Sequence, residues 1–285
     1  MHKIRSVFRK STSSPRFQIL SDLHLEVGQQ YSSFHIPPVA QYLILAGDIG
    51  RLIDYAPYLA FLAKQTQTFE RVFLVLGNHE FYGLSFTTGL EAARKLESEP
   101  ILKGKLLLLH QQRINIPSTN ISILGCTLWS RINFEAHDIV QMKVKDFQKI
   151  EEWSVDAHNL AHVSDITWLR DQVAAIQQEK EASLKENKRK ILVVTHHAPS
   201  VIETARPEQV GNAWSSAFAT DVLGGEIWES VKVWVFGHTH FTTDFKKSGI
   251  RVVSNQRGYV LPGVEQKSDE NDKKKVFDVR RAIYV

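Results

Sequence analysis

Cysteine is nearly absent from this sequence, since Cys126 stands alone among 285 residues. A single cysteine excludes a disulfide within the chain and any cysteine-rich zinc module. This composition favours a reducing compartment, and we expect a cytoplasmic protein. Cys126 ends the apolar stretch 121–126, a context that predicts a buried structural thiol and not a nucleophile.

Long apolar runs are also missing from the sequence. No segment approaches the roughly 20 apolar residues that a membrane-spanning helix needs, and no signal-peptide core is present. Lys and Arg exceed Asp and Glu by only 35 to 31, so nucleic acid is not an expected partner. Residues 1–14 carry several bases and no acid, which makes a mitochondrial location the alternative; a basic tail before the first strand is the favoured interpretation.

The apolar residues that are present, 43% of the chain, form short runs bounded by Gly, Pro, Asn or Asp, as is typical of buried strands. The runs are Phe17–Leu20, Tyr42–Leu45, Val72–Leu76, Leu106–Leu109, Ile121–Leu124, Ile191–Val194 and Val231–Phe236. Helical periodicity lies between them, at Ala56–Lys64, Thr88–Leu96 and Asp165–Lys185. This alternation predicts an α/β sheet that helices cover on both faces.

Residues 128–164 interrupt the alternation, with tryptophans and histidines among charged residues. We expect one domain over residues 1–285 with an inserted helical lobe at about 128–164. Thr243–Lys247 and Ile250–Ser254 flank a Ser-Gly turn and predict a hairpin. Glu265–Lys275 is almost wholly polar and predicts a solvated loop.

Polar motifs follow five of the predicted strands directly. They are Asp22-Leu23-His24, Gly47-Asp48, Gly77-Asn78-His79-Glu80, Thr195-His196-His197 and Gly237-His238-Thr239-His240. Ligands of open α/β sheets bind beyond the carboxyl ends of the strands, so these five loops should converge. One such fragment alone is more often structural than functional, but five in order are hard to obtain by chance.

The chemistry of these side chains suits a transition-metal site. Carboxylate oxygen, amide oxygen and imidazole nitrogen fit borderline ions such as Mn, Fe or Zn, and the lack of thiolates argues against a structural zinc. Residues two apart in an extended segment point to the same side, so Asp22 with His24, and His238 with His240, can each enter one crevice, although a tight turn would change this geometry. Glycines before three of the motifs permit sharp turns and close approach.

The five motifs resemble those of the calcineurin-like metallophosphoesterases, and the resemblance spans Phe17 to Phe245. It implies a two-sheet α/β sandwich flanked by helices and a pair of divalent or trivalent metal ions. It further implies a non-ligand catalytic role for His79 and a local structural role for Glu80, with Asp48 bridging the ions. The implied ligands are Asp22, His24, Asp48 and His240 for one ion, and Asp48, Asn78, His196 and His238 for the other.

Two positions stay open beside this resemblance. Many members carry another acid or amide soon after Gly-Asp, whereas here Asp48 is followed by Ile49-Gly50-Arg51. His196 and His197 compete for one ligand position, and His196 is favoured because it directly follows the strand. His197, Arg51 and Arg206 are candidate substrate contacts, and the segment Asn212–Asp221 is a candidate pocket wall.

The predicted function is hydrolysis of phosphate mono- or diesters by a hydroxide held on a dinuclear metal centre, with His79 assisting the leaving oxygen. The expected partner is a phosphorylated small molecule. A nuclease of the same chemistry is the alternative, although the dispersed charge lacks the basic groove that it would need. A non-catalytic scaffold of the same fold is a third possibility that the complete ligand set disfavours.

Overall fold

Two β-sheets face each other in a computed structural model that describes residues 14–181, 189–263 and 276–285. The first sheet has the order β11-β1-β2-β3-β4, and all neighbours are parallel except β11 with β1. Its strands are β1 (Arg16–Leu20), β2 (Tyr42–Ala46), β3 (Arg71–Val75), β4 (Leu106–Leu108) and β11 (Ala282–Tyr284). The predicted fold class, an α/β sandwich of two sheets, is confirmed.

The second sheet has the order β5-β6-β7-β8-β10-β9, with antiparallel strands only at its two edges. Its strands are β5 (Gln112–Asn115), β6 (Ile121–Gly125), β7 (Lys190–Val194), β8 (Val231–Phe236), β9 (Asp244–Lys247) and β10 (Ile250–Ser254). The predicted hairpin is present as β9 and β10, which pair antiparallel around Ser248 and Gly249.

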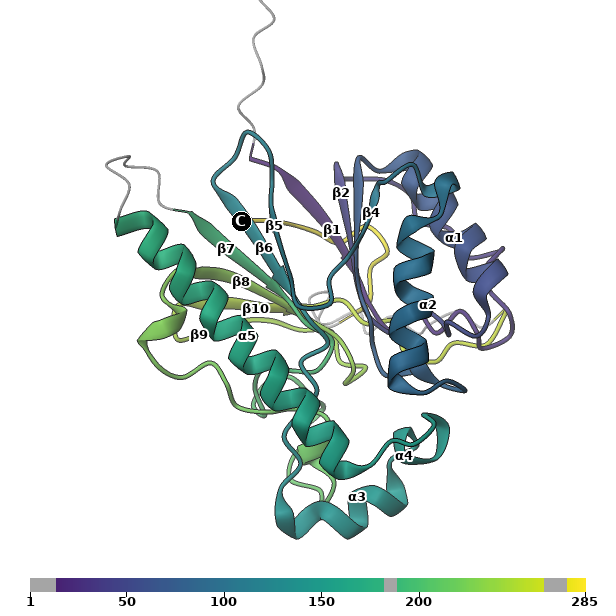
Figure 1. Ribbon diagram of the computed structural model, residues 1–285, viewed down its shortest axis with the longest axis vertical. Helices are drawn as coiled ribbons and strands as arrows, with labels where there is room; N and C mark the ends of the chain where they lie inside the picture. The colour runs from purple at the N-terminus through teal and green to yellow at the C-terminus, as the bar shows by residue number, and fades with distance from the viewer. Residues whose placement is uncertain (1–13, 182–188, 264–275) are drawn as a thin grey trace, which may run out of the picture.

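The described helices cover only the outer face of each sheet, because the inner faces pack on each other, so the expected covering of both faces by helices is wrong (Figure 1). The α-helices are α1 (Tyr55–Thr68), α2 (Phe86–Ser98), α3 (His137–Lys143), α4 (Asp146–Lys149) and α5 (Val155–Glu181). In Figure 1, α1 and α2 lie against the first sheet, α5 runs along the second, and α3 and α4 project at one end of the molecule. None of these helices is long and apolar enough to span a membrane, within the residues described.

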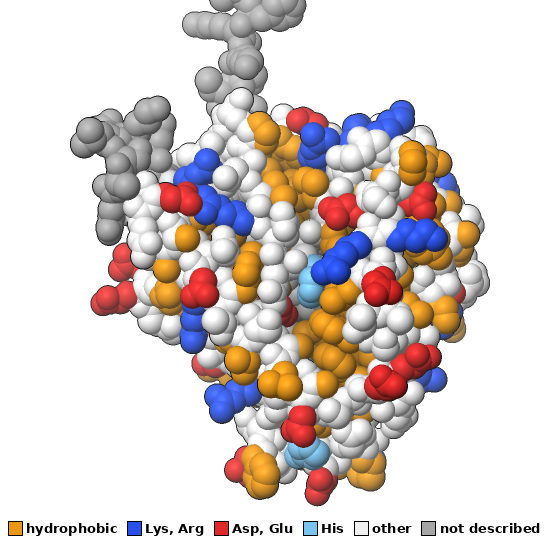
Figure 2. Space-filling model, viewed as in Figure 1, with side chains coloured by type: hydrophobic (Ala, Val, Ile, Leu, Met, Phe, Trp, Pro, Cys, Tyr) orange, Lys and Arg blue, Asp and Glu red, His pale blue; other side chains and the backbone are white. Residues whose placement is uncertain are grey.

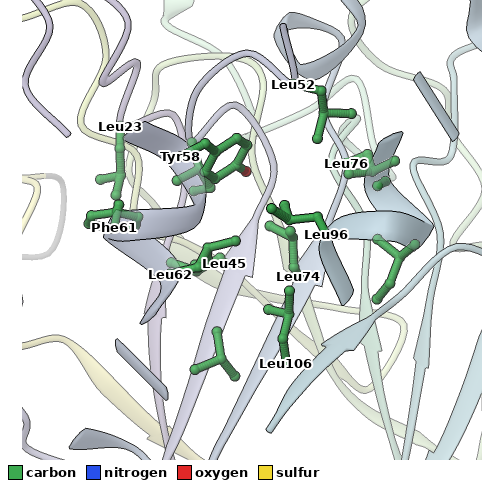
Figure 3. Packing of buried hydrophobic residues seen from close by; sticks show 14 of the residues in the cluster. Leu23, Leu45, Leu52, Tyr58, Phe61, Leu62, Leu74, Leu76, Leu96 and Leu106 are labelled. Atoms are coloured by element: carbon green, nitrogen blue, oxygen red, sulfur yellow. The ribbon is translucent and has the colours of Figure 1, made fainter. Parts of the chain in front are cut away.

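Three apolar layers hold this arrangement together. The layer between the sheets contains Phe17, Phe73 and Val235, all fully or almost fully buried. Outside the first sheet, Phe61 of α1 and Leu96 of α2 pack on strand residues, as Figure 3 shows for this cluster. Truncating a central ring such as Phe73 to alanine should cost about 3–5 kcal/mol, because a cavity would open in the close-packed core.

The structure corrects the start of the long helix. The pattern predicted Asp165–Lys185, whereas α5 begins at Val155, ten residues earlier. The Oγ of Ser154 accepts a hydrogen bond from the backbone N of Ala157 and so caps the helix. The predicted lobe at 128–164 therefore contains α3, α4 and also the first part of α5. Residues 182–188 lie outside the described part of the chain, as do the basic residues 1–13 and the whole predicted polar loop at 265–275.

Cys126 follows β6 and is fully buried, which confirms the structural thiol expected from the sequence. Burial raises the pKa of this thiol well above its usual value, so the reactive thiolate form is suppressed. The strands themselves run so that β1, β2, β3, β7 and β8 all end at one edge of the sandwich. The five polar motifs leave the sheets at that edge.

Candidate metal centre

The backbone of the five motif loops is unusual because it turns left-handed at candidate ligands. Asp22, His24, Asp48, His238 and His240 all have φ between 46° and 74°, although none is glycine. Such conformations cost roughly 1–2 kcal/mol in an L-residue and persist only where surrounding contacts enforce them. Here the sharp turns carry each side chain back into the crevice between the sheets.

The first group of donors joins the loop after β1 to the loop after β8. Ligand atoms of Asp22, His24 and His240 all lie within 4.8 Å of one another. The Nε2 atoms of His24 and His240 are 2.9 Å apart, and the Nε2 of His240 is 3.6 Å from Asp22 Oδ1. Two imidazole nitrogens that face each other this closely need a proton or a metal cation between them.

The second group joins the loops after β2, β7 and β8. Ligand atoms of Asp48, His196 and His238 again lie within 4.8 Å of one another. Asn78 adds an oxygen, because its Oδ1 is 3.0 Å from His196 Nε2 and 3.1 Å from His238 Nδ1. The expected donor His196 faces this group, with its Nε2 3.4 Å from Asp48 Oδ1.

Asp48 stands between the two groups and offers one oxygen to each. Its Oδ2 lies 3.8 Å from His24 Nε2, whereas its Oδ1 is directed to His196. Gly77 allows this close approach, since a Cβ at that position would meet Asp48 Oδ1 at 2.2 Å. The glycine before Asn78 is therefore a steric requirement of the site, as its position in the motif predicted.

The donor set fits transition-metal ions. Each group mixes carboxylate oxygens with imidazole nitrogens, which suits borderline ions such as Mn, Fe or Zn. The Nδ1 of His196 lies 3.0 Å from the Ala46 carbonyl, to which it donates, and this bond leaves Nε2 free for a metal. Burial lowers the pKa of His196, but the charge of Asp48 raises it to about 10. The same carboxylate field would attract a metal ion in competition with that proton.

His79 borders both groups and is held from two sides. Its Nδ1 donates to Glu26 Oε1 at 2.9 Å, and its Nε2 lies 3.0 Å from the hydroxyl of Tyr259. The ring of Tyr82 stacks on it, with centroids 4.1 Å apart. Burial opposes a proton on His79, but the charges of Asp48 and Glu26 raise its pKa above the usual value.

Glu26 supports two imidazoles with one carboxylate oxygen. Its Oε1 accepts from His79 Nδ1 and also lies 3.3 Å from His24 Nδ1. Burial disfavours its charge, but the hydrogen bonds from His24 and His79 lower the pKa of Glu26 to about 2. Many family members were expected to carry a further acid after Gly-Asp; in this chain the acid beside His79 comes from the loop after β1.

Glu80 joins the loops beneath the site, in line with the local role expected for it. The Oε2 atom accepts from the backbone N of Gly77 and of Asp48, and Oε1 accepts from Ile49 and from the hydroxyl of Tyr58. Burial, and then the charge of Asp48, raise the pKa of Glu80 to about 7. The Glu80 carboxyl group thereby holds the loop after β2 and the loop after β3 in fixed positions relative to each other.

The helical lobe also reaches the site, through Asp146 of α4. Its Oδ1 accepts hydrogen bonds from Asn78 Nδ2 and from the Tyr82 hydroxyl, both at 2.7 Å. The bond to Nδ2 fixes the amide of Asn78 so that Oδ1 faces the two histidines. Asp146 is therefore a positioning residue for a candidate metal ligand.

A cavity of about 820 Å³ opens beside the two groups. Its walls include Asp48, His79 and His238 at one end and the lobe residues 143–146 elsewhere. Most of the segment Asn212–Asp221 lines it, as the sequence suggested.

The three candidate substrate contacts have different surroundings. Arg206 lines the cavity. Arg51 instead forms a two-bond ion pair with Asp54, at 2.9 and 3.0 Å, and lies outside the described cavity lining. His197 is fully buried beneath His238, with ring centroids 4.0 Å apart, so its side chain does not reach the cavity. Burial lowers the pKa of His197 well below its usual value.

Four residues at the site were not predicted from the sequence, namely Glu26, Tyr82, Asp146 and Tyr259. Glu26 follows His24 by two residues, but the backbone is left-handed at Asp22 and His24, so strand alternation does not place its side chain. Tyr82 is three residues beyond His79 and directly follows η1 (His79–Phe81). Asp146 and Tyr259 come from the lobe and the chain after β10, where no motif marks them.

The chain belongs to the calcineurin-like phosphoesterase family, whose model matches residues 15–241. An uncharacterized protein of Acanthamoeba polyphaga mimivirus is 28% identical over 267 residues, which cover 84% of this chain and 90% of that protein. The crystal structure of phosphopantetheinyl hydrolase from Mycobacterium tuberculosis is similar in fold, with a TM-score of 0.63. It shares 15% identity and covers 86% of this chain and 90% of its own.

Proposed function

We propose that this protein hydrolyses phosphate mono- or diesters with a pair of transition-metal ions. The observation that carries the proposal is the position of Asp48, which directs one carboxylate oxygen to each of two donor groups. The family membership supports the reaction class. The proposed ligands are the seven expected from the sequence, namely Asp22, His24, Asp48, Asn78, His196, His238 and His240.

Two ions, when bound, would lower the pKa of water to supply a hydroxide nucleophile and would neutralise charge on the phosphate oxygens. In the hydrolysis, an oxygen from water bonds to phosphorus, the ester P–O bond breaks, and the alcohol leaves with a proton. The chain orients these partners through Asp48 and Asn78, whose side chains are fixed by backbone and lobe contacts. Fixed donors of this kind avoid reorganisation during the reaction.

His79 is the proposed source of the leaving-group proton. With Nδ1 held by Glu26, the other ring nitrogen, Nε2, faces Asp48 Oδ2 at 4.0 Å and lines the open end of the site. A proton at Nε2 would neutralise the alkoxide as the P–O bond breaks. Tyr259, whose hydroxyl lies 3.0 Å from Nε2, holds this ring in place until the substrate enters.

The test is metal analysis followed by kinetics. Metal-free protein is reconstituted with Mn²⁺, Fe²⁺ or Zn²⁺, the bound ions are counted, and 4-nitrophenyl phosphate is compared with bis(4-nitrophenyl) phosphate. We expect two ions per chain, with hydrolysis that depends on them. The preferred ester then separates monoesterase from diesterase activity.

The variant His110→Gln is a matched control, because His110 belongs to none of the metal-binding groups found in the described chain. It should retain both ions and full turnover. Complete metal loading without hydrolysis of either ester would contradict the proposal and favour a non-catalytic scaffold.

A further inference from the structure

The cavity beside the metal centre is much larger than a phosphate group requires. Its volume of about 820 Å³ lies in the range of pockets that enclose whole cofactor-sized molecules. Metal-site residues form only one end of it. The lobe residues 143–146 and the segment 201–221 supply most of the remaining wall.

Four basic side chains line this outer wall, and we name them the cavity cations. They are Arg131, Lys143, Lys145 and Arg206. All four residues are exposed, and none makes a side-chain hydrogen bond or ion pair within the described parts of the chain. Arg113 and Arg251, by contrast, are each paired through two hydrogen bonds with a carboxylate. The cavity cations therefore keep their charge for a ligand.

The acidic residues of the cavity wall do not offset these charges. Asp221 is bound to Lys247 at 2.6 Å. Asp146 is buried, and its Oδ1 is occupied by Asn78 and Tyr82. Asp48 belongs to the metal end. The outer cavity is therefore electropositive and suited to an anion.

Apolar surface accompanies the charge. Phe218 stacks on His238, with ring centroids 4.9 Å apart, so it carries an apolar wall directly to the metal end. Trp214, from the same segment as Phe218, also lines the cavity. Val201 and Val210 line it as well, and they are 44% and 52% exposed. An aromatic or apolar group of a ligand would cover these side chains.

We propose that the substrate is a phosphoester with a second phosphate, joined to the first through an aromatic or apolar body. This inference rests on the proposed phosphoester hydrolase and specifies its substrate class. The scissile phosphate occupies the metal end, the body lies on Phe218 and Trp214, and the cavity cations hold the second phosphate. Four positive charges match a dianionic phosphate better than a singly charged carboxylate.

A small bisphosphate fits better than a nucleic acid. On the face shown in Figure 2, basic and acidic side chains are interspersed and form no continuous basic stripe. A nucleic-acid channel would need such a stripe along the backbone path. The cavity cations instead surround a single pocket.

The test compares matched substrates that differ only in the second phosphate. Adenosine 3′,5′-bisphosphate is compared with adenosine 5′-monophosphate, and hexane-1,6-diol bisphosphate with the corresponding monophosphate, on the Mn²⁺-loaded full chain. We expect kcat/KM to favour at least one bisphosphate by about tenfold or more, as two or three exposed ion pairs would give. The combined variant Lys143→Gln/Lys145→Gln should reduce this preference to about twofold. Calorimetric binding to the His79→Gln variant should show the same ranking without turnover.

Lys246→Gln is the matched control, because Lys246 is exposed on β9 and lies outside the cavity lining. It should keep the preference. Equal kcat/KM for mono- and bisphosphates in both pairs would overturn the inference, as would a preference that survives the Lys143 and Lys145 substitutions. Stronger hydrolysis of a long oligonucleotide than of every bisphosphate would also overturn it. If the chromogenic esters are not hydrolysed at all, the proposed function itself fails, which is a separate result.

Discussion

The candidate metal centre and the outer cavity wall differ in how many hydrogen-bond or ion-pair partners their polar side chains have. At the metal centre, donors such as Asp48 and His196 are buried and held by backbone and side-chain contacts. On the outer wall, Lys143 and Arg206 are exposed and have no described side-chain partner. The sheets thus fix the groups proposed for the chemistry, while the lobe and long loops carry those proposed for recognition, as is common where sites are built on a rigid scaffold.

The largest effect should follow from substitution of Asp48, which serves both donor groups. Asp48→Asn should release metal and lower kcat/KM on the order of 10⁴-fold, because the shared negative charge is lost. Metal analysis and steady-state kinetics measure the two effects. Retention of both ions with normal turnover would contradict the proposal that the buried donors hold the metal ions.

His79→Gln should separate chemistry from metal binding. We expect both ions to stay bound while kcat falls about 10³-fold, because the proton donor is lost and the proposed ligands are intact. The ratio of metal to protein is measured on the same samples as kcat. Normal activity in this variant would remove His79 from the mechanism.

Glu26→Gln should produce an intermediate effect. The amide oxygen still accepts a hydrogen bond but carries no negative charge, so the contacts with His79 and His24 weaken. Such outer contacts are typically worth about 10–100-fold in activity or metal affinity. We expect kcat at saturating metal to fall, with KM little changed, and Glu26→Asp to recover part of the loss. Glu91→Gln on the exposed face of α2 serves as the control.

The smallest effect concerns His158 of α5, a buried residue outside the cavity lining whose ring contacts Trp129 and His197. Burial lowers the pKa of His158 to about 3. Between that value and the unfolded pKa of about 6.5, only the unfolded chain binds the proton, so stability falls as the pH falls. His158→Gln should reduce this slope by about 1.4 kcal/mol per pH unit.

Urea unfolding between pH 4 and 6, with chelator present so that metal release does not contribute, measures the slope. His137→Gln is the control, because that side chain is 43% exposed on α3. An unchanged slope in the His158 variant would show that this imidazole is protonated in the folded protein.

The sheets and the loops with the candidate ligands were predictable because their signals are local. Each motif directly follows an apolar strand, and the rule that sites form beyond strand ends placed the five loops together. The missed strands, β5 and β11, are short edge strands, and the polar sequence of β5 gives no apolar run. The early start of α5 was signalled only by one capping serine, Ser154.

The contacts of individual side chains were less predictable, because they depend on three-dimensional packing. Arg51 has an acid three residues later and pairs with it, so a phosphate contact could not be inferred from charge alone. His196 and His197 are adjacent, yet one faces Asp48 and the other enters the core. Tyr259 reaches His79 from 180 positions away, a distance over which no spacing rule operates.

The left-handed backbone at Asp22, His24, Asp48, His238 and His240 makes stability and the proposed metal binding compete at the same positions. Glycine at any one of them would relieve local strain of roughly 1 kcal/mol while deleting a proposed ligand. Selection for thermal stability alone would therefore favour variants that have lost proposed metal ligands. Engineering of higher thermal stability therefore has to leave those five residues unchanged and substitute other positions.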